Sequence, residues 1–368
     1  MKNFNDIIEK KGIFIIAECG VNYYDIAEKL DISLMEAAKL MIEKAAESGA
    51  DAVKFQSYKA DKLASKNSPA YWDLSEESTK TQYDLFKKFD KFGEEEYKEL
   101  SSYCNSKKVI FLSTPFDFEA VDYLNNLMPI FKISSSDITN LPLIKYIASK
   151  NKPIFLSTGA SDIGEIYEAV NIIKLINDKQ ISLMHCILSY PTDYKDANLN
   201  MIKHLNKIFP DCLIGYSDHT KTDNCLLVLI SAYLKGAKII EKHFTLDKEL
   251  KGNDHYHAMD PIDLKRFISN LNLIKEIDGQ FLKEPLECEK AARLNARRSI
   301  IAKVNITKND KIKREMITFK RPGIGIPPNM LDYVIGGLAL KDIKENDIIM
   351  FDDIRLNDFQ KQRGYYEQ

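Results

Sequence analysis

The chain has 368 residues, of which 45% are hydrophobic and 29% are charged. Its fifteen glycines and twelve prolines are ordinary numbers, which excludes collagen-like, low-complexity and wholly disordered chains. Lysine and arginine number 52 against 54 aspartates and glutamates, and the net charge of −2 excludes a general electrostatic attraction for nucleic acid. Because this length exceeds that at which one core stops growing, we expect a large domain and a small one.

The sequence also bears on the compartment of the protein. The longest uncharged apolar run, Cys225 to Leu234, is shorter than the about 20 residues needed to span a bilayer. Gly12–Ala17 is followed directly by Glu18 without a small-residue cleavage site, so we expect no signal peptide. The six cysteines form no C-x-x-C pair, which argues against a disulfide framework or a zinc ribbon. We therefore expect a cytoplasmic protein with no membrane or nucleic-acid partner.

Eight short apolar runs follow one another along the first 245 residues. Their nearly continuous apolar character is typical of parallel strands that are buried on both faces. The predicted strands are Ile13–Glu18, Ala52–Gln56, Val109–Thr114, Ile130–Ser134, Pro153–Thr158, Ile181–Cys186, Cys212–Tyr216 and Ala237–Glu241.

Helical patterns separate these runs. In Leu34–Ser48 the apolar residues recur at helical spacing, and Ser33 with Glu36 has the pattern of a capping box. Eight strand–helix units within about 285 residues predict an α/β fold, a (β/α)₈ TIM barrel. A doubly wound sheet is the alternative, but no G-x-G-x-x-G follows the first strand. Ser57–Lys108 must hold more than one helix, and its segment Asn67–Trp72 is expected to fold over the barrel mouth.

The pattern changes after about Gln280. We expect the barrel to occupy residues 1–282, a linker residues 283–297 with a short helix at Glu289–Arg297, and a small β-rich module residues 298–358. Two similar turns, Thr307–Asp310 and Lys344–Asp347, hint at internal symmetry in that module. The polar tail from Asn357 is expected to be loose. The short strands predicted for the module are Ser299–Val304, Met316–Phe319, Val334–Gly336 and Ile348–Phe351.

Every predicted barrel strand ends in polar side chains. In this fold the carboxyl ends of the strands meet at one mouth, where the active site lies. These residues are Glu18; Lys54 and Gln56; Ser113 and Thr114; Lys132, Ser135 and Asp137; Ser157 and Thr158; His185; Ser217, Asp218 and His219; and Glu241, Lys242 and His243. The sequence therefore predicts one polar site.

The residue types indicate a substrate and a metal. Lys54 and Lys132, together with nearby hydroxyls, suit a small anion that carries phosphate and carboxylate. His219 and His243 end adjacent strands and could converge on one divalent metal, although each alone is equally typical of a hydrogen-bonded structural histidine. Two imidazoles without a thiolate suggest an open, catalytic coordination sphere.

The loop Asp254–His257 contains an H-x-H pattern, which could also bind metal as it does in amidohydrolase-type barrels. Those barrels place the pair on strand one, where this chain offers only Glu18. We interpret the loop as one that contacts substrate.

Six motifs follow one another along the chain: Ile15–Asn22 (IIAECGVN), Ala52–Gln56 (AVKFQ), Leu112–Phe116 (LSTPF), Gly215–Thr220 (GYSDHT), Ile240–Thr245 (IEKHFT) and Lys320–Gly323 (KRPG). These motifs resemble the N-acetylneuraminate (sialic acid) synthase family, and the C-terminal module is similar to the SAF (antifreeze-like) domain. The resemblance covers nearly the whole chain.

The resemblance implies a transferase that condenses phosphoenolpyruvate with an N-acylated mannosamine-type sugar to a nine-carbon 2-keto acid and phosphate. It implies that His219 and His243 hold a divalent metal, often Mn²⁺, with Mg²⁺ or Co²⁺ as alternatives. It also implies a domain-swapped homodimer, in which Arg321 reaches the sugar's N-acyl group in the partner's barrel. The positions that match phosphoenolpyruvate-binding ones are Lys54, Lys132, Ser135, Ser157 and Ser217, and those that match sugar-contacting ones are Glu18, Gln56, Asp137, Tyr190 and Asp254. Glu18 is the candidate acid or base, and Lys54 and Lys132 stabilise the reacting anion.

Departures from the family pattern fall mostly near the sugar pocket. Leu188 stands where the family has a polar contact to phosphoenolpyruvate, and Asp137 stands where it mostly has Glu. We therefore expect retained chemistry with an open choice of sugar, including legionaminic- or pseudaminic-type acceptors. The alternatives are a related synthase that acts on a phosphorylated sugar, which would need further basic residues, and a non-enzymatic carbohydrate-binding protein.

Overall fold

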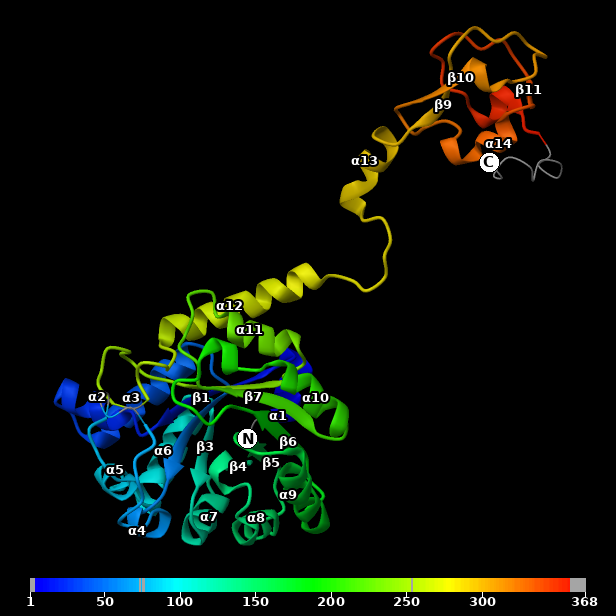
Figure 1. Ribbon diagram of the computed structural model, residues 1–368. Coiled ribbons are helices and arrows are strands. Elements are labelled where there is room, and N and C mark those ends of the chain that lie inside the picture. The colour runs from blue at the N-terminus through cyan, green and yellow to red at the C-terminus, as the bar shows by residue number, and fades with distance from the viewer. Residues whose placement is uncertain (1–3, 73, 75–76, 253, 358–368) are drawn as a thin grey trace. The chain divides into compact units, whose positions relative to one another are not determined.

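The computed structural model describes residues 4–72, 74, 77–252 and 254–357 (Figure 1). The chain divides into two compact units, Met1–Asp278 and Gly279–Gln368, which are described in turn. The expected loose tail beyond Asn357 lies outside the described residues. None of the helices in the described part of the chain has the length and apolar character needed to cross a membrane.

The first unit is built on one eight-stranded parallel sheet with the strand order β3-β2-β1-β8-β7-β6-β5-β4. The end strands β3 and β4 contact one another, so the sheet closes into a near-barrel and confirms the predicted fold class. Each predicted barrel strand overlaps an observed one. The strands are β1 Phe14–Gly20, β2 Ala52–Ser57, β3 Ile110–Pro115, β4 Phe131–Ile133, β5 Ile154–Ser157, β6 Ile181–His185, β7 Leu213–Asp218 and β8 Ile239–His243.

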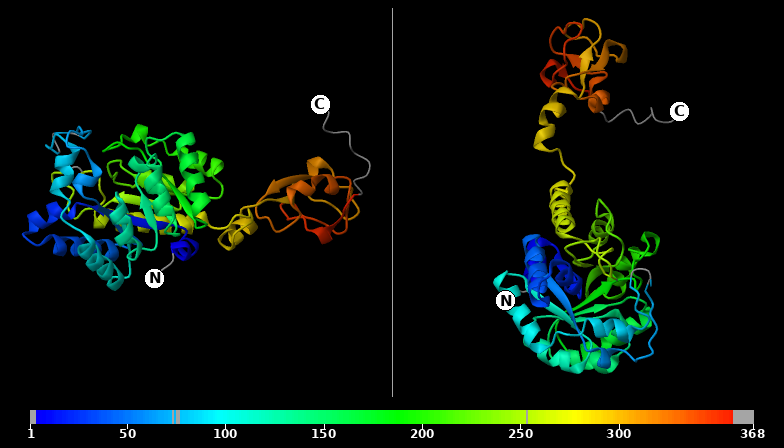
Figure 2. Two further views of the ribbon diagram at one scale, coloured as in Figure 1. Left: turned by 90° about the horizontal axis from the view of Figure 1, so that it is seen from below. Right: turned by 90° about the vertical axis from the view of Figure 1, so that its left-hand side faces the viewer.

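Helices surround this sheet, as Figures 1 and 2 show. The capping box of α3 is present, because the backbone N–H of Glu36 donates to Ser33 Oγ (3.2 Å) and that of Ser33 to Glu36 Oε2 (2.9 Å). As expected, more than one helix lies between β2 and β3. The helices are α1 Phe4–Lys11, α2 Tyr23–Leu30, α3 Leu34–Glu47, α4 Ala60–Leu63, α5 Gln82–Lys88, α6 Glu94–Ser106, α7 Phe118–Asn125, α8 Leu141–Ala148, α9 Ile163–Ile176, α10 Asn200–Ile208, α11 Leu227–Leu234 and α12 Pro261–Asp278.

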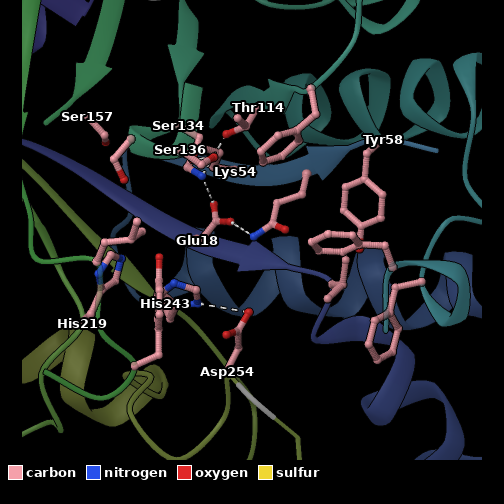
Figure 3. Close-up of a pocket in the computed structure, with 18 of the residues that line it drawn as sticks. Glu18, Lys54, Tyr58, Thr114, Ser134, Ser136, Ser157, His219, His243 and Asp254 are labelled. Carbon is pink, nitrogen blue, oxygen red and sulfur yellow. Dashed lines mark hydrogen bonds and ion pairs between the residues drawn. The ribbon is translucent and has the colours of Figure 1, made fainter. Parts of the chain in front are cut away.

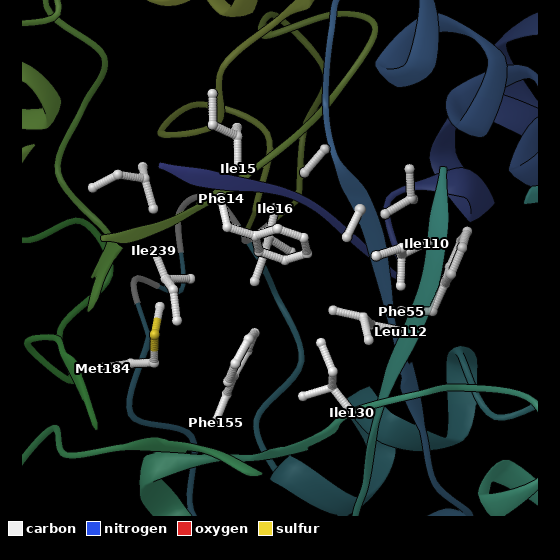
Figure 4. Close-up of a cluster of buried hydrophobic side chains, with 14 of the residues drawn as sticks. Phe14, Ile15, Ile16, Phe55, Ile110, Leu112, Ile130, Phe155, Met184 and Ile239 are labelled. Atoms are coloured by element: carbon white, nitrogen blue, oxygen red, sulfur yellow. The ribbon is translucent and has the colours of Figure 1, made fainter. Parts of the chain in front are cut away.

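Large apolar side chains fill the amino-terminal half of the barrel (Figure 4). Phe14 and Phe155 are fully buried and meet edge to face at 6.1 Å, and Phe4 of α1 packs 5.2 Å from Phe155. Burial of each such side chain is worth about 1.5–3 kcal/mol. Gly215 is needed here, since a Cβ at this position would lie 2.3 Å from Met184 Sδ. Because this end is packed shut, a substrate must enter from the carboxyl ends of the strands.

The second unit has its own small core and two antiparallel pairs, β9 with β10 and β11 with β12. The prediction of a strand at Val334–Gly336 is wrong, because Val334 is the last residue of a one-turn helix. Gly336, two residues later, has a left-handed φ of 81°. The run from Ile348 makes only an isolated bridge to Ile301, and the strand follows at β12. The elements are α13 Lys290–Asn295, β9 Ser299–Ala302, β10 Ile317–Lys320, α14 Leu331–Val334, β11 Leu338–Ala339 and β12 Ile354–Arg355.

The two similar turns of this unit have the same structure. In Thr307–Asp310 and in Lys344–Asp347, the first backbone N–H donates to the carboxylate of the fourth residue at 2.9 Å. The third residue, Asn309 or Asn346, has a left-handed φ of 71° or 68°. The backbone N–H of Asn309 donates to Ala339 and that of Asn346 to Ala302, so the symmetry suggested by the sequence is present in the fold.

Candidate active site

A pocket of about 350 Å³ opens at the carboxyl ends of the barrel strands (Figure 3). All predicted site residues of the first unit line it: Glu18, Lys54, Gln56, Lys132, Ser135, Asp137, Ser157, Tyr190, Ser217, His219, His243 and Asp254. Arg321, the remaining predicted residue, lies in the second unit directly after β10 and is exposed. The barrel thus brings together residues from seven strands or the loops that follow them.

Lys54 lies at the base of this pocket in a polar cluster. Its Nζ is 2.5 Å from Glu18 Oε2 and 3.2 Å from Thr114 Oγ1. Glu18 Oε1 accepts a hydrogen bond from Gln56 Nε2 at 3.0 Å. The parallel register of β1 and β2 places Glu18 opposite Lys54, which explains why the two side chains meet.

A second lysine cluster adjoins the first. Lys132 Nζ donates to Ser157 Oγ at 2.8 Å and is 3.4 Å from Glu241 Oε1. The same carboxylate oxygen of Glu241 lies 3.8 Å from Lys54 Nζ and accepts a hydrogen bond from Ser217 at 3.0 Å. Glu241 therefore links the two buried lysines, and the base of the pocket holds two cations and two carboxyl groups.

Burial and neighbouring charge tune these groups. Burial raises the pKa of Glu18 to about 7, although Lys54 opposes the rise. Burial alone would also raise the pKa of Glu241, but Lys132 and Lys54 outweigh it and hold that pKa below its usual value. Burial lowers the pKa of Lys132. At neutral pH, Glu18 is thus poised between its acid and base forms, which is the property required of a proton-transfer group.

The sequence predicts Glu241 among the polar residues at the strand ends but gives it no role in the site. Alternation along β8 could have assigned it to the pocket, because residues two apart in a strand share a face and His243 lines the pocket. Lys242, between them, points the other way and pairs with Asp218 Oδ2 at 2.6 Å, with both side chains almost fully buried. That pair joins β7 to β8 directly beneath the histidine positions.

The two predicted metal histidines lie side by side at the pocket wall. Their ring centroids are 5.6 Å apart. His219 Nδ1 is 2.6 Å from the carbonyl oxygen of Ile187. Because a carbonyl oxygen can only accept a hydrogen bond, Nδ1 carries the proton and donates it, which leaves Nε2 of His219 with the lone pair that can bind a metal. Burial lowers the pKa of His219 to about 4 and that of His243 well below its usual value. Both rings are therefore neutral at physiological pH, the form that binds metals.

A third histidine adjoins this pair. One possible ligand atom from each of His243, Asp254 and His257 lies within 4.8 Å of the others. Such donors fit a divalent cation of the Mn²⁺ or Co²⁺ type. Burial raises the pKa of Asp254 to about 6, against the opposing charge of His255. The sequence assigns the metal to His219 and His243 and the H-x-H loop with His257 to substrate contact, because the H-x-H spacing does not reveal that His257 is buried.

The outer part of the pocket is aromatic. Tyr58 packs edge to face against Phe86 at 5.1 Å and against Phe116 at 5.9 Å. Tyr71 and Trp72, from the segment expected over the mouth, also line the pocket. Trp72 Nε1 donates to the carbonyl of Glu77 at 3.1 Å, which fixes the indole. Among the described lining residues, Lys54 and Lys132 are the only lysine or arginine side chains.

Comparison with known proteins gives the same assignment for both parts of the chain. The NeuB family profile matches residues 41–283, and the SAF domain profile matches residues 297–355. An uncharacterized protein of Methanocaldococcus jannaschii is 42% identical over 342 residues, which cover 93% of this chain and 94% of that protein. An N,N'-diacetyllegionaminic acid synthase of Campylobacter jejuni is 38% identical over 344 residues, which cover 92% of this chain and 99% of that protein.

A solved structure supports this relation. The crystal structure of N-acetylneuraminic acid (sialic acid) synthetase from Leptospira borgpetersenii serovar Hardjo-bovis, in complex with citrate, is 32% identical with a TM-score of 0.64. The match covers 76% of this chain and 90% of that one. The resemblance of the motifs is thereby confirmed: the chain belongs to the NeuB family and carries a SAF domain at its C-terminal end.

Proposed function

We propose that this enzyme condenses phosphoenolpyruvate with the open-chain aldehyde of an N-acylated sugar, giving a nine-carbon 2-keto acid and phosphate. The observation that carries the proposal is the base of the pocket, where buried Lys54 and Lys132 share Glu241 next to a cluster of neutral histidines. Two buried ammonium groups suit a compact trianion, and nearby imidazoles suit the metal that such an aldehyde requires.

The lysines and hydroxyls bind the anionic substrate. Lys132 with Ser157, and Lys54 with Thr114, present donors from neighbouring strands toward one space. Ser135 and Ser217 add hydroxyls to the same pocket. Because these groups are already held by hydrogen bonds and ion pairs, they need little rearrangement when the anion binds.

The acceptor aldehyde lies in this proposal between the lysines and the histidines. His219 and His243, with the adjacent Asp254, would hold a divalent metal, with Mn²⁺ preferred over Mg²⁺ or Co²⁺. When bound, that metal supplies Lewis-acid polarisation of the aldehyde oxygen. Glu18 is the proton donor to that oxygen as carbon–carbon bond formation gives it negative charge, since its pKa of about 7 keeps much of the acid form at neutral pH.

The proposed reaction forms one carbon–carbon bond and breaks the C2–O bond to phosphate. C3 of phosphoenolpyruvate attacks the aldehyde carbon, and the aldehyde oxygen takes the proton of Glu18. Water adds to C2, which carries the positive charge that the attack leaves, and gives one proton back to the Glu18 carboxylate. The tetrahedral intermediate then loses phosphate by cleavage of the C2–O bond, the C2 hydroxyl proton leaves with the phosphate, and C2 becomes the keto carbon. The lysines stabilise the phosphate and carboxylate charges throughout.

The acceptor is proposed to be unphosphorylated. A sugar phosphate would need cations at the far end of the pocket, where the described lining is aromatic and contains neither lysine nor arginine. Aromatic faces suit the apolar faces and N-acyl methyl groups of a sugar. The 38% identity to a diacetyllegionaminic acid synthase makes a 2,4-diacetamido hexose a leading candidate, with N-acetylmannosamine as the simpler alternative.

The remaining assignments are proposed on the resemblance. Gln56, Asp137 and Tyr190 contact the sugar, and Arg321 binds its N-acyl group within a domain-swapped homodimer. The proposed limits are residues 1–282 for the barrel, 283–297 for the linker and 298–358 for the SAF domain, in a cytoplasmic enzyme. Light scattering gives the oligomeric state, and the acceptor KM of Arg321→Ala tests the arginine.

The direct test is release of phosphate from phosphoenolpyruvate across a panel of sugars, with Mn²⁺ and with EDTA. Bridging-¹⁸O phosphoenolpyruvate reports the bond that breaks. The proposal predicts sugar-dependent release that EDTA abolishes, with ¹⁸O in the phosphate. Release that is independent of any sugar, or ¹⁸O retained in the keto acid, contradicts it.

A further inference from the structure

His257 is the most conspicuous buried group that the proposed reaction leaves unused. Its side chain is fully buried, and neither ring nitrogen has a hydrogen-bond partner among the described residues. A buried polar atom without a partner costs about 1–3 kcal/mol. An unsatisfied group in a native protein often marks an ion or a water that completes it.

The surroundings of His257 point to an ion. Its ring centroid lies 4.7 Å from that of His243, whose Nδ1 also lacks a hydrogen-bond partner in the described structure. That Nδ1 is 3.5 Å from Asp254 Oδ2 (Figure 3). His243, Asp254 and His257 each offer a ligand atom within 4.8 Å of the others. Neighbouring atoms bound to one ion at about 2.1 Å stand about 3.0–3.4 Å apart, so an ion would draw these three side chains roughly an ångström closer together.

The other histidine of the H-x-H pattern provides an internal contrast. His255 Nδ1 is 2.7 Å from Thr245 Oγ1, and its Nε2 is 3.0 Å from Asp25 Oδ2. Both of its nitrogens are thus occupied by protein groups, and it fixes the loop. His257, two residues on, is equally buried but has no such partners among the described residues, so their hydrogen bonds do not account for its burial.

We propose that His257 is a metal ligand, which with His243 and Asp254 forms a His–Asp–His site for a divalent cation. The site shares His243 with the pair assigned above and adds an imidazole to it. The inference rests on the proposed function only in that the proposed reaction requires a metal. It is tested by measuring metal binding directly, in the absence of substrates.

The first experiment measures Mn²⁺ affinity and thermal unfolding of the full chain and of His257→Leu. We expect a loss of Mn²⁺ affinity of at least about 10- to 100-fold in the variant, since mutation of even an outer-shell partner of a metal ligand costs that much. In EDTA the variant should unfold at the same or a higher temperature, because two unsatisfied nitrogens are replaced by an apolar group. Mn²⁺ should then raise the unfolding temperature less in the variant than in the wild type. His204→Leu, on the exposed surface of α10, is the control and should match the wild type.

A second variant keeps the test independent of stability. His257→Cys places a thiolate at the same position, and Co²⁺ bound by it should gain a thiolate-to-cobalt charge-transfer band that the wild type lacks. Pulsed electron paramagnetic resonance of bound Mn²⁺ should count one imidazole fewer in His257→Leu than in the wild type.

The opposite results would overturn the inference. Wild-type Mn²⁺ affinity with an unchanged imidazole count in His257→Leu, together with no charge-transfer band in His257→Cys, excludes His257 as a ligand. If His257→Leu lowers the unfolding temperature by the same amount with and without Mn²⁺, the role of His257 is purely structural. Mn²⁺ binding through His257 without any sugar-dependent phosphate release would contradict the proposed function alone.

Discussion

The base and the rim of the pocket are built in different ways. At the base, Glu18, Lys54, Lys132 and Glu241 come from strands, are almost fully buried and contact one another within 4 Å. The rim comes largely from the segment between β2 and β3, and its aromatic side chains are held by ring packing (Figure 3). The difference suggests that the barrel fixes the chemistry, while the inserted segment selects the acceptor.

Removing a charge from the base should have the largest effect. For Lys132→Met we expect kcat/KM for phosphoenolpyruvate to fall about 10³-fold, because a preorganised cation in a buried site is lost. Since Glu241 then keeps only the more distant Lys54, the double variant Lys132→Met/Glu241→Gln is the matched control. It should unfold at a temperature close to that of the wild type and remain inactive. Recovery of activity in the double variant would show that the lysine only neutralises Glu241.

A neutral isostere at Glu18 should have the next largest effect. For Glu18→Gln we expect kcat to fall about 10²-fold at pH 6.5, a usual contribution of a general acid. A raised pKa of about 7 means that the acid form is present below pH 7 and is lost as the pH rises through it. Wild-type kcat/KM should therefore decline above about pH 7, whereas the variant should lack this decline. A variant with the same alkaline decline would assign the titration to another group.

At the rim the effect should be smaller and confined to the acceptor. Phe86 of α5 lines the pocket and packs against Tyr58 at 5.1 Å. For Phe86→Ala we expect the acceptor KM to rise about tenfold, as for one lost aromatic contact, with the KM for phosphoenolpyruvate unchanged. Steady-state kinetics with each substrate varied in turn measures both constants. An equal rise of the two KM values would break the division between base and rim.

The smallest effect is expected at Leu188, which lines the pocket from the loop after β6. Leu188→Thr introduces a hydroxyl at the position where the resemblance implies a polar contact to phosphoenolpyruvate. We expect the KM for phosphoenolpyruvate to fall about threefold, the equivalent of one modest hydrogen bond. A change in the acceptor KM instead would place Leu188 with the rim.

The same contrast explains what the sequence could predict. The strands were predictable because they are nearly continuous apolar runs, and the residues at their ends followed because a barrel brings those ends together. The role of Glu241 could not be predicted because it depends on contacts across the barrel to Lys54 and Lys132, which no local pattern shows. The burial of His257 and the placement of Phe86 likewise depend on how loops pack. In the small unit, Val334 was misread because an apolar residue that ends a short helix looks the same as one in a short strand.

The division between base and rim is tested most directly by comparing kcat/KM for N-acetylmannosamine with that for its 6-phosphate, at saturating phosphoenolpyruvate and Mn²⁺. Because the described residues of the rim are largely aromatic and include neither lysine nor arginine, the unphosphorylated sugar should be preferred by at least about 100-fold, since a buried phosphate without cations costs several kcal/mol. A preference for the 6-phosphate would contradict the account, because the rim would then have to bind a charge that its described residues do not match.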